Sequence, residues 1–143
     1  MARITTKQSD KILYDMAIPY LAELSEALGY EVFTYWPGLD APRKPDRTRV
    51  YVEVQRAILG KEPLGLQADS GFIATGQLTI SLSATEKQDD YPKCSSAVEK
   101  LVEAFDRRRC GYDLVIHGAR WEDTVVKDGR RVFNIMVDYE FET

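Results

Sequence analysis

The chain has 143 residues, the size of one ordinary domain that buries a substantial core without disulfides or metals. Its composition, with 44% hydrophobic and 29% charged residues, is that of a globular protein and lacks the marks of a membrane-spanning or a disordered chain. The net charge of -4 excludes a global positive field that would draw the whole molecule to nucleic acid, and leaves a local basic patch open.

The first element that the sequence predicts is a helix. Residues 1–7 lack the apolar stretch and cleavage site of a secretory signal, so we expect synthesis and folding in a cytoplasm. An amphipathic helix is predicted over Ser9–Leu28 and closes at Gly29, while Pro19 predicts a kink or a helix in two pieces. The apolar positions that define it are Leu13, Met16, Ala17, Tyr20, Leu24, Ala27 and Leu28.

Two strands and two long connections follow. Glu31–Trp36 is rich in β-branched and aromatic residues and predicts a strand that stops at Pro37-Gly38. Leu39–Thr48 contains two prolines and several basic residues, and predicts an exposed loop. The alternation of Val50, Val52 and Val54 with polar residues predicts a second strand that ends near Ile58 or Leu59. Gly60–Gly71 predicts a second long connection.

The clearest strand in the sequence is Phe72–Ser83, where apolar and small polar residues alternate. Its polar face consists mostly of hydroxyl side chains, which face water or a partner at little desolvation cost. We therefore expect one face of the sheet to be uncovered.

A second helix is predicted from Asp89, Asp90 and Pro92 to Gly111. The run Arg107–Arg109 would fall in its last turn, where cations suit the helix dipole. Cys94 and Cys110 both lie in this predicted helix, about 24 Å apart. This separation excludes a disulfide and predicts two reduced, structural cysteines.

The C-terminal part predicts two strands. The first is Tyr112–His117, and the second follows a turn at Asp128-Gly129. One face of this final strand carries Phe133, Ile135, Val137, Tyr139 and Phe141. The predicted fold is one α+β domain over residues 1–143. It has two layers, with about five mostly antiparallel strands and two helices packed on one sheet face, in the order α-β-β-β-α-β-β.

Residue types that carry chemistry are sparse. His117 is the one histidine, so a catalytic triad would have to form around it, and we expect a structural histidine on the polar strand face. The pairs Asp89-Asp90 and Glu122-Asp123 are typical of loops and helix starts. No phosphate-binding glycine loop follows any strand. We therefore expect no enzymatic activity, no metal and no cofactor.

The basic loop with Arg43, Lys44, Arg47 and Arg49 leaves three interpretations open. It is a solvated loop that follows a buried anchor, Trp36, or a protein interface, or a phosphate-binding loop with Trp36 stacked on a base. Arginine and tryptophan are enriched at interface hot spots, which favours a protein partner over nucleic acid.

The order of several short motifs resembles the tail-terminator family of long-tailed bacteriophages. The segments are Tyr35-Trp36-Pro37-Gly38, Arg49–Val54, Gly76–Leu82, the helical Ala97–Phe105 and the closing Tyr139-Glu140-Phe141. Family members often carry asparagine or aspartate where this chain has Gly38, a position that needs an easy turn.

The resemblance implies a virion protein at the head-proximal end of a tail, assembled in the host cytoplasm. It would form a homo-oligomeric ring, commonly a hexamer, that stops polymerisation of the tail tube protein and joins a neck or head-completion protein. DNA would only pass through the ring lumen, and no membrane is involved. We expect ring or tube contacts in Pro37–Thr48 and Gly60–Gly71, with candidate residues Trp36, Arg43, Lys44, Arg47, Lys61 and Gln67.

Three other readings compete with this one. A head-completion or neck adaptor protein would share the size and the ring habit. A nucleic-acid-binding module would use the basic loop and Arg107–Arg109. An enzyme would depend on His117 together with a nearby acid.

Overall fold

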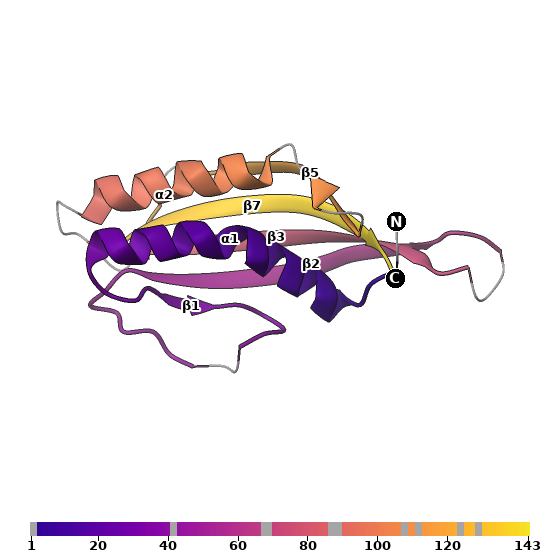
Figure 1. Cartoon of the computed structure of the whole chain (residues 1–143), viewed down its shortest axis with the longest axis horizontal. Helices are drawn as coiled ribbons and strands as arrows, with labels where there is room; N and C mark the ends of the chain where they lie inside the picture. The colour runs from indigo at the N-terminus through magenta and orange to yellow at the C-terminus, as the bar shows by residue number, and fades with distance from the viewer. Residues whose placement is uncertain are drawn as a thin grey trace.

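Both helices pack on one face of a mostly antiparallel sheet (Figure 1). The computed structural model describes residues 3–40, 43–66, 70–85, 90–106, 109–110, 113–122, 125–127 and 130–143. The elements are α1 (Thr6–Leu28), β1 (Phe33–Tyr35), β2 (Tyr51–Pro63), β3 (Phe72–Ala84), α2 (Asp90–Phe105), β4 (Arg109–Cys110), β5 (Leu114–Trp121), β6 (Val125–Lys127) and β7 (Arg130–Glu142).

The strand order is β1-β2-β3-β7-β5-β4, and β6 pairs with β7. β1 and β2 are parallel, and the other pairs are antiparallel. The predicted two-layer α+β fold is thus confirmed. The described residues add two short strands, β4 and β6, to the five that the sequence indicated.

Helix α1 begins earlier than predicted because Thr5 and Gln8 form a capping box, in which each side chain accepts a hydrogen bond from the other residue's backbone N–H. Gly29 ends the helix with a left-handed φ of 82°. Pro19 cannot donate a backbone hydrogen bond to the turn before it. The helix nevertheless stays continuous, and Figure 1 shows that it bends along its length.

The core lies between the sheet and the two helices. β3 and β7 supply alternate side chains to it, which are fully or almost fully buried: Leu78, Ile80, Leu82, Phe133, Ile135, Val137, Tyr139 and Phe141. The opposite side chains of these strands, such as Thr79, Ser81 and Asn134, stay partly exposed. Among the described residues, the predicted uncovered polar face is therefore present.

An ion pair ties the first turns of α1 to β2 beneath the helix layer. The Arg56 guanidinium donates two hydrogen bonds of 3.0 Å to the Asp10 carboxylate, whose side chain has no exposed surface. The Tyr139 ring lies in the core nearby, and its burial, together with the charge of Asp10, raises its pKa to about 12. The start of α1 is thus held by polar as well as apolar contacts.

The predicted end of the second helix was wrong. Helix α2 ends at Phe105, and Arg109 and Cys110 instead form β4, which pairs with Val115 and Leu114. The expected capping of the helix by Arg107–Arg109 therefore fails for Arg109, and residues 107–108 lie outside the described part. The premise that both cysteines share one helix fails as well.

Two strands run further than their alternation indicated, because each contains a β-bulge. The register of β2 shifts between Ile58 and Gly60, and the strand continues to Pro63. The register of β5 shifts between Ile116 and Gly118, and this strand ends at Trp121 rather than at His117. A bulge inserts one residue and inverts the alternation, so the pattern stops where the strand does not.

Candidate protein interface

Trp36 is buried directly after β1 and anchors the loop that follows. Its side chain is 0% exposed, and its ring meets Tyr14 of α1 edge to face, with 5.5 Å between the centroids. Its backbone N–H donates a 2.8 Å hydrogen bond to Asp40 Oδ2, which closes the turn at residues 36–40. The burial confirms the anchor and excludes stacking on a nucleic-acid base.

Two separate features of this turn favour glycine at position 38. Its φ of 81° is left-handed, and a Cβ at this position would collide with the buried carboxylate of Asp10. The turn therefore packs directly on the Asp10–Arg56 pair.

The basic side chains of the loop are exposed, as predicted, but two of them also contact aromatic rings of the same chain. The Arg43 guanidinium lies 4.7 Å from the centroid of the Phe33 ring, and that of Arg49 lies 4.8 Å from Tyr30. Such cation–π contacts hold the side chains against the protein surface. Lys44 and Arg47 are exposed on the same loop.

Arg130 connects the end of this loop to the sheet through hydrogen bonds. It was not identified from the sequence as a candidate residue. It donates to the carbonyl oxygens of Arg47 and Arg49, to Ser83 Oγ at 2.7 Å and to the Ser83 carbonyl at 3.1 Å. Its guanidinium also lies 4.8 Å from the Tyr51 ring centroid. Local sequence gives no signal for a contact between residues 83 positions apart.

Asp46 makes hydrogen bonds within the loop, just before the carbonyl groups that Arg130 contacts. Thr48 donates to the Asp46 carboxylate through its backbone N–H at 2.9 Å and its hydroxyl at 2.6 Å, and these bonds lower the pKa of Asp46. The loop backbone is thus fixed at both ends.

The second predicted contact region is a projecting hairpin. Because β2 continues to Pro63, the connection to β3 is shorter than predicted, and Leu64 N–H donates to the Gly71 carbonyl at 3.0 Å. We call residues 59–66 and 70–72 the arm, which extends beyond both helices (Figure 1). Lys61 is exposed on the arm, and Gln67 lies outside the described residues.

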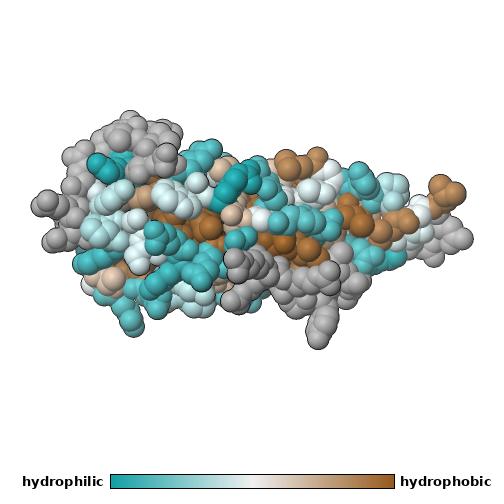
Figure 2. Space-filling model, turned by 90° about the horizontal axis from the view of Figure 1, so that it is seen from above, coloured by the Kyte–Doolittle hydropathy of each residue, from teal (hydrophilic) through white to brown (hydrophobic). Residues whose placement is uncertain are grey.

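The arm carries large apolar side chains that sequence reasoning missed as interface candidates. Leu59 is 64% exposed, Leu64 is 40% exposed, Phe72 is 43% exposed and Leu66 is fully exposed. Figure 2 shows hydrophobic side chains gathered on this narrow end of the molecule. The sequence did contain one indication of this surface, because Leu64 and Leu66 lie beside Pro63 and Gly65 in a connecting segment, where polar residues are usual.

The residues considered for chemistry occupy structural positions. His117 lies on the open sheet face, with Nε2 3.3 Å from Glu140 Oε1. Cys94 is a buried free thiol whose pKa is raised by desolvation to about 12. Asp90 accepts a hydrogen bond from the Thr85 hydroxyl, and Glu122 is exposed. Asp89, Asp123 and the side chain of Cys110 lie outside the described residues.

The described residues contain no group of three or more His, Cys, Asp or Glu side chains placed to hold a metal ion. No described helix is both long and apolar enough to cross a membrane.

Comparison with known proteins yields a likeness of fold. No protein-family model matches the chain, and no curated protein matches it significantly in sequence. The structure is similar to a chain of the solved "Virion of native gene transfer agent (GTA) particle", with a TM-score of 0.53 and 16% sequence identity. The match covers 94% of this chain and 94% of that chain.

Proposed function

We propose that this chain is a structural protein of a phage-like virion, and that it forms a ring on the head-proximal end of the tail tube. The ring stops tube polymerisation and offers the surface to which the head joins. The observation that carries the proposal is the fold shared with a virion chain along 94% of both chains. The order of sequence motifs resembles tail terminators and supports the same role independently.

The open face of the sheet suits the lumen of such a ring. Many of its side chains are polar and linked across strands, as in the 2.7 Å bond from Ser81 to Asn134 and the 2.7 Å pair of Arg120 with Asp138, and Val132 and Met136 lie among them. Glu53 and Glu140 add negative charge on this face. A hydrated, mildly acidic wall repels phosphates, so DNA passes without being held.

The basic loop suits a contact with a neighbouring subunit or with the tube. The buried Trp36 and the hydrogen bonds of Arg130 already fix the backbone of this loop. Little conformational entropy is therefore lost when Lys44 and Arg47 bind a partner. In this role the loop carries no reaction, and the chain needs no metal or cofactor.

A neck or head-completion adaptor is the second candidate, because the description of the similar chain names a whole virion and not one junction within it. A nucleic-acid-binding module has weaker support. Arg43 and Arg49 already stack on rings of their own chain, and the chain has a net charge of -4.

Sedimentation with isolated tail tubes and with DNA-filled heads separates these candidates. A terminator binds the tubes without any head present, whereas an adaptor binds the filled heads and leaves bare tubes unoccupied. A nucleic-acid-binding module instead retains free DNA, with an affinity that falls steeply as salt is raised. Binding to heads alone would overturn the terminator assignment.

A further inference from the structure

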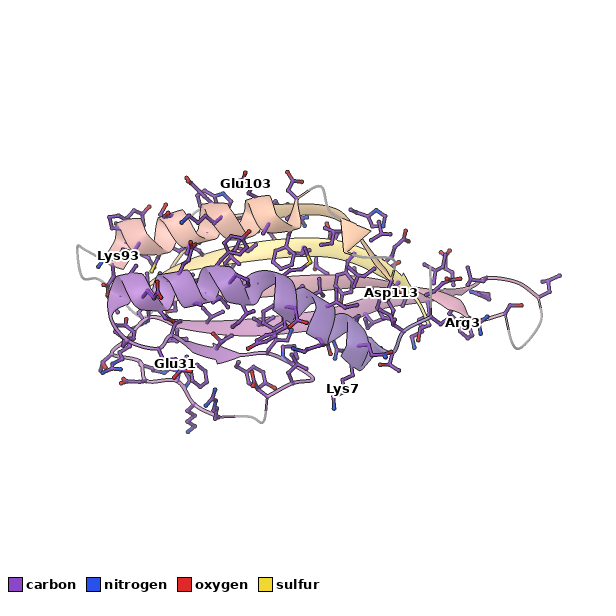
Figure 3. All side chains as sticks on the ribbon, in the orientation of Figure 1. Arg3, Lys7, Glu31, Lys93, Glu103 and Asp113 are labelled. Atoms are coloured by element: carbon purple, nitrogen blue, oxygen red, sulfur yellow. The ribbon has the colours of Figure 1, made fainter. Side chains whose placement is uncertain are left out.

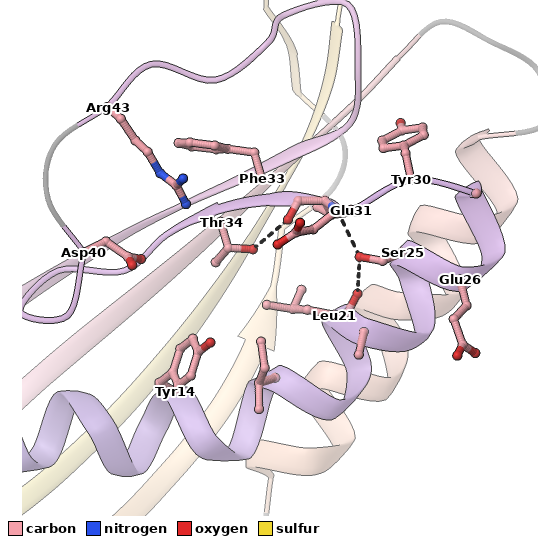
Figure 4. Close-up of a pocket in the computed structure, with 14 residues that line it drawn as sticks. Tyr14, Leu21, Ser25, Glu26, Tyr30, Glu31, Phe33, Thr34, Asp40 and Arg43 are labelled. Atoms are coloured by element: carbon pink, nitrogen blue, oxygen red, sulfur yellow. Dashed lines mark hydrogen bonds between the residues drawn. The ribbon is translucent and has the colours of Figure 1, made fainter.

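Two features, the arm and a groove, lie on different parts of the molecule. The arm projects from the end at which both termini lie (Figure 1). A groove is lined by residues of α1, of β1 and of the segments on either side of β1 (Figure 4). The floor of the groove includes the core residues Leu21 and Val32, whereas Tyr14, Ile18 and Phe33 in its walls are partly exposed. Isolated exposed apolar residues are normal on protein surfaces, but four on one projecting element form a surface suited to contact.

The groove has a volume of about 780 Å³, within the usual range of ligand pockets. Its apolar walls come from Tyr14, Ile18, Leu21, Ala22 and Phe33. Ser25 links α1 to the segment before β1, because its hydroxyl donates to the Leu21 carbonyl at 3.1 Å and accepts from Val32 N–H at 3.0 Å (Figure 4). β1 is also an edge strand, paired only with β2 among the described strands.

The charges of the two features are complementary. The groove is lined by Glu26, Glu31 and Asp40 against one cation, Arg43. On the arm, Lys61 pairs with Ala74 and Pro63 pairs with Phe72, which places Lys61 on the same strand face as Phe72, while Glu62 falls on the other face. Figure 3 shows Arg3, a second cation, at the base of the arm and Glu31 beside β1.

We propose that the arm of one copy of this chain docks in the groove of a neighbouring copy. Leu64, Leu66 and Phe72 would cover the apolar walls, and Lys61 would meet the acidic side of the groove. The two surfaces differ, so the contact is head-to-tail, which closes into a ring when the rotation between copies allows it. The inference deepens the proposed function, and rests on it only in taking the oligomer to be a ring.

A mixing experiment with two single-site variants tests this contact. Leu66→Cys places a thiol on the arm and Ala22→Cys places one in the groove, each in a Cys110→Ser background, and a short bifunctional thiol reagent is added. Both positions are exposed, so the monomer fold is unaffected. Glu103→Cys, on the exposed face of α2, replaces the groove variant in the control mixture.

The expected product joins the arm variant to the groove variant, and exceeds the Glu103→Cys control by about tenfold, as a specific complex with high effective concentration requires. Arm-to-arm products from Leu66→Cys alone, without that mixed product, would overturn the proposal. So would a yield equal to the control, or cross-links formed only to added tube protein.

Two further variants report on association rather than on proximity. Leu66→Ser should weaken self-association by about tenfold or more, and Ala22→Arg should do the same by filling the groove. Neither should change the midpoint of unfolding, because both side chains are exposed. Cross-linking that persists in a protein unable to bind tubes would refute the tube role and leave the contact standing.

Discussion

Gly38 combines a backbone requirement with a steric one. Its left-handed φ disfavours any side chain, and the Asp10 carboxylate occupies the space that a Cβ needs. Gly29 has the same φ, at 82°, but open space around it. This pair of glycines separates the two effects within one protein.

We predict that Gly29→Ala costs about 1 to 2 kcal/mol, the usual penalty of the left-handed region, and that Gly38→Ala costs clearly more. The measurement is the free energy of unfolding from urea titration of both variants. Equal losses would show that the turn relaxes away from Asp10 without cost.

The Asp10–Arg56 pair holds the first turns of α1 against β2. Removing Asp10 leaves a largely buried guanidinium without its partner, because the side chain of Arg56 is only 25% exposed. We predict that Asp10→Ala lowers the free energy of unfolding by about 3 to 5 kcal/mol. The matched control is Asp15→Ala, which breaks the exposed pair with Lys11 and should cost less than about 1 kcal/mol.

Arg56→Met tests the cause of that loss. Added to Asp10→Ala, it removes the unpaired charge and should recover part of the stability, as buried ion pairs replaced by apolar groups often do. No recovery in the double variant would mean that packing around Asp10, not charge, sets the cost.

Cys94 should be inert at neutral and mildly alkaline pH. Burial raises its pKa from the usual 9.0 to about 12, so the folded chain keeps the proton above pH 9 while the unfolded chain loses it. The stability that this proton contributes is complete below about pH 9 and is lost as pH rises toward 12.

In a Cys110→Ser variant, alkylation of Cys94 at pH 9 should be about a hundredfold or more slower in the folded protein than in urea. Mass spectrometry of timed samples measures both rates. Similar rates would show that the thiol is not shielded in the folded state.

At the scale of elements, the basic loop is the surface that the sequence singled out first. Replacing Arg43, Lys44 and Arg47 with alanine should weaken ring or tube association about tenfold or more, because interface arginines often act as hot spots. The monomer should stay folded, since all three side chains are exposed. Light scattering and tube sedimentation measure the association.

The control for this variant is the triple replacement of Lys7, Lys93 and Lys100 by alanine. It removes the same charge from exposed positions outside the loop, two of which are labelled in Figure 3. Equal weakening in both variants would assign the effect to net charge, and unchanged association in the loop variant would remove the loop from the interface.

Element types were predictable from the sequence, whereas several of their ends were not. Alternation in β3 and β7 and helical spacing in α1 reflect burial on one side, which local sequence encodes directly. The bulges in β2 and β5 hid the true strand ends. Helix α2 ended early because Arg109 and Cys110 pair with β5, a tertiary contact that propensity does not encode.

The candidate interface was predictable in part for the same reason. Local composition indicated the basic loop and its buried tryptophan anchor. The hydrogen bonds of Arg130 to the loop and to Ser83 join residues far apart in the chain, and so does the groove between α1 and β1. Patterns of neighbouring residues in the sequence therefore do not reveal either feature. The interface role of the six predicted residues remains a prediction.

At the scale of the whole molecule, the sheet divides the chain into a helix-covered side and an open polar side. In the proposed ring, the open side faces the passage for DNA, and the arm and the groove join successive copies. The two helices then face outward or toward the tube and head. The positions of the open side and of the helices depend on the ring arrangement, whereas the contact between the arm and the groove is tested independently of the tube role.

The most direct test of the tail-terminator role is electron microscopy of tube protein polymerising with and without this chain. The account predicts that added chain shortens the tubes and places an extra ring at one end of each. Tubes of unchanged length with bare ends would contradict it, and the neck adaptor would then be the better description.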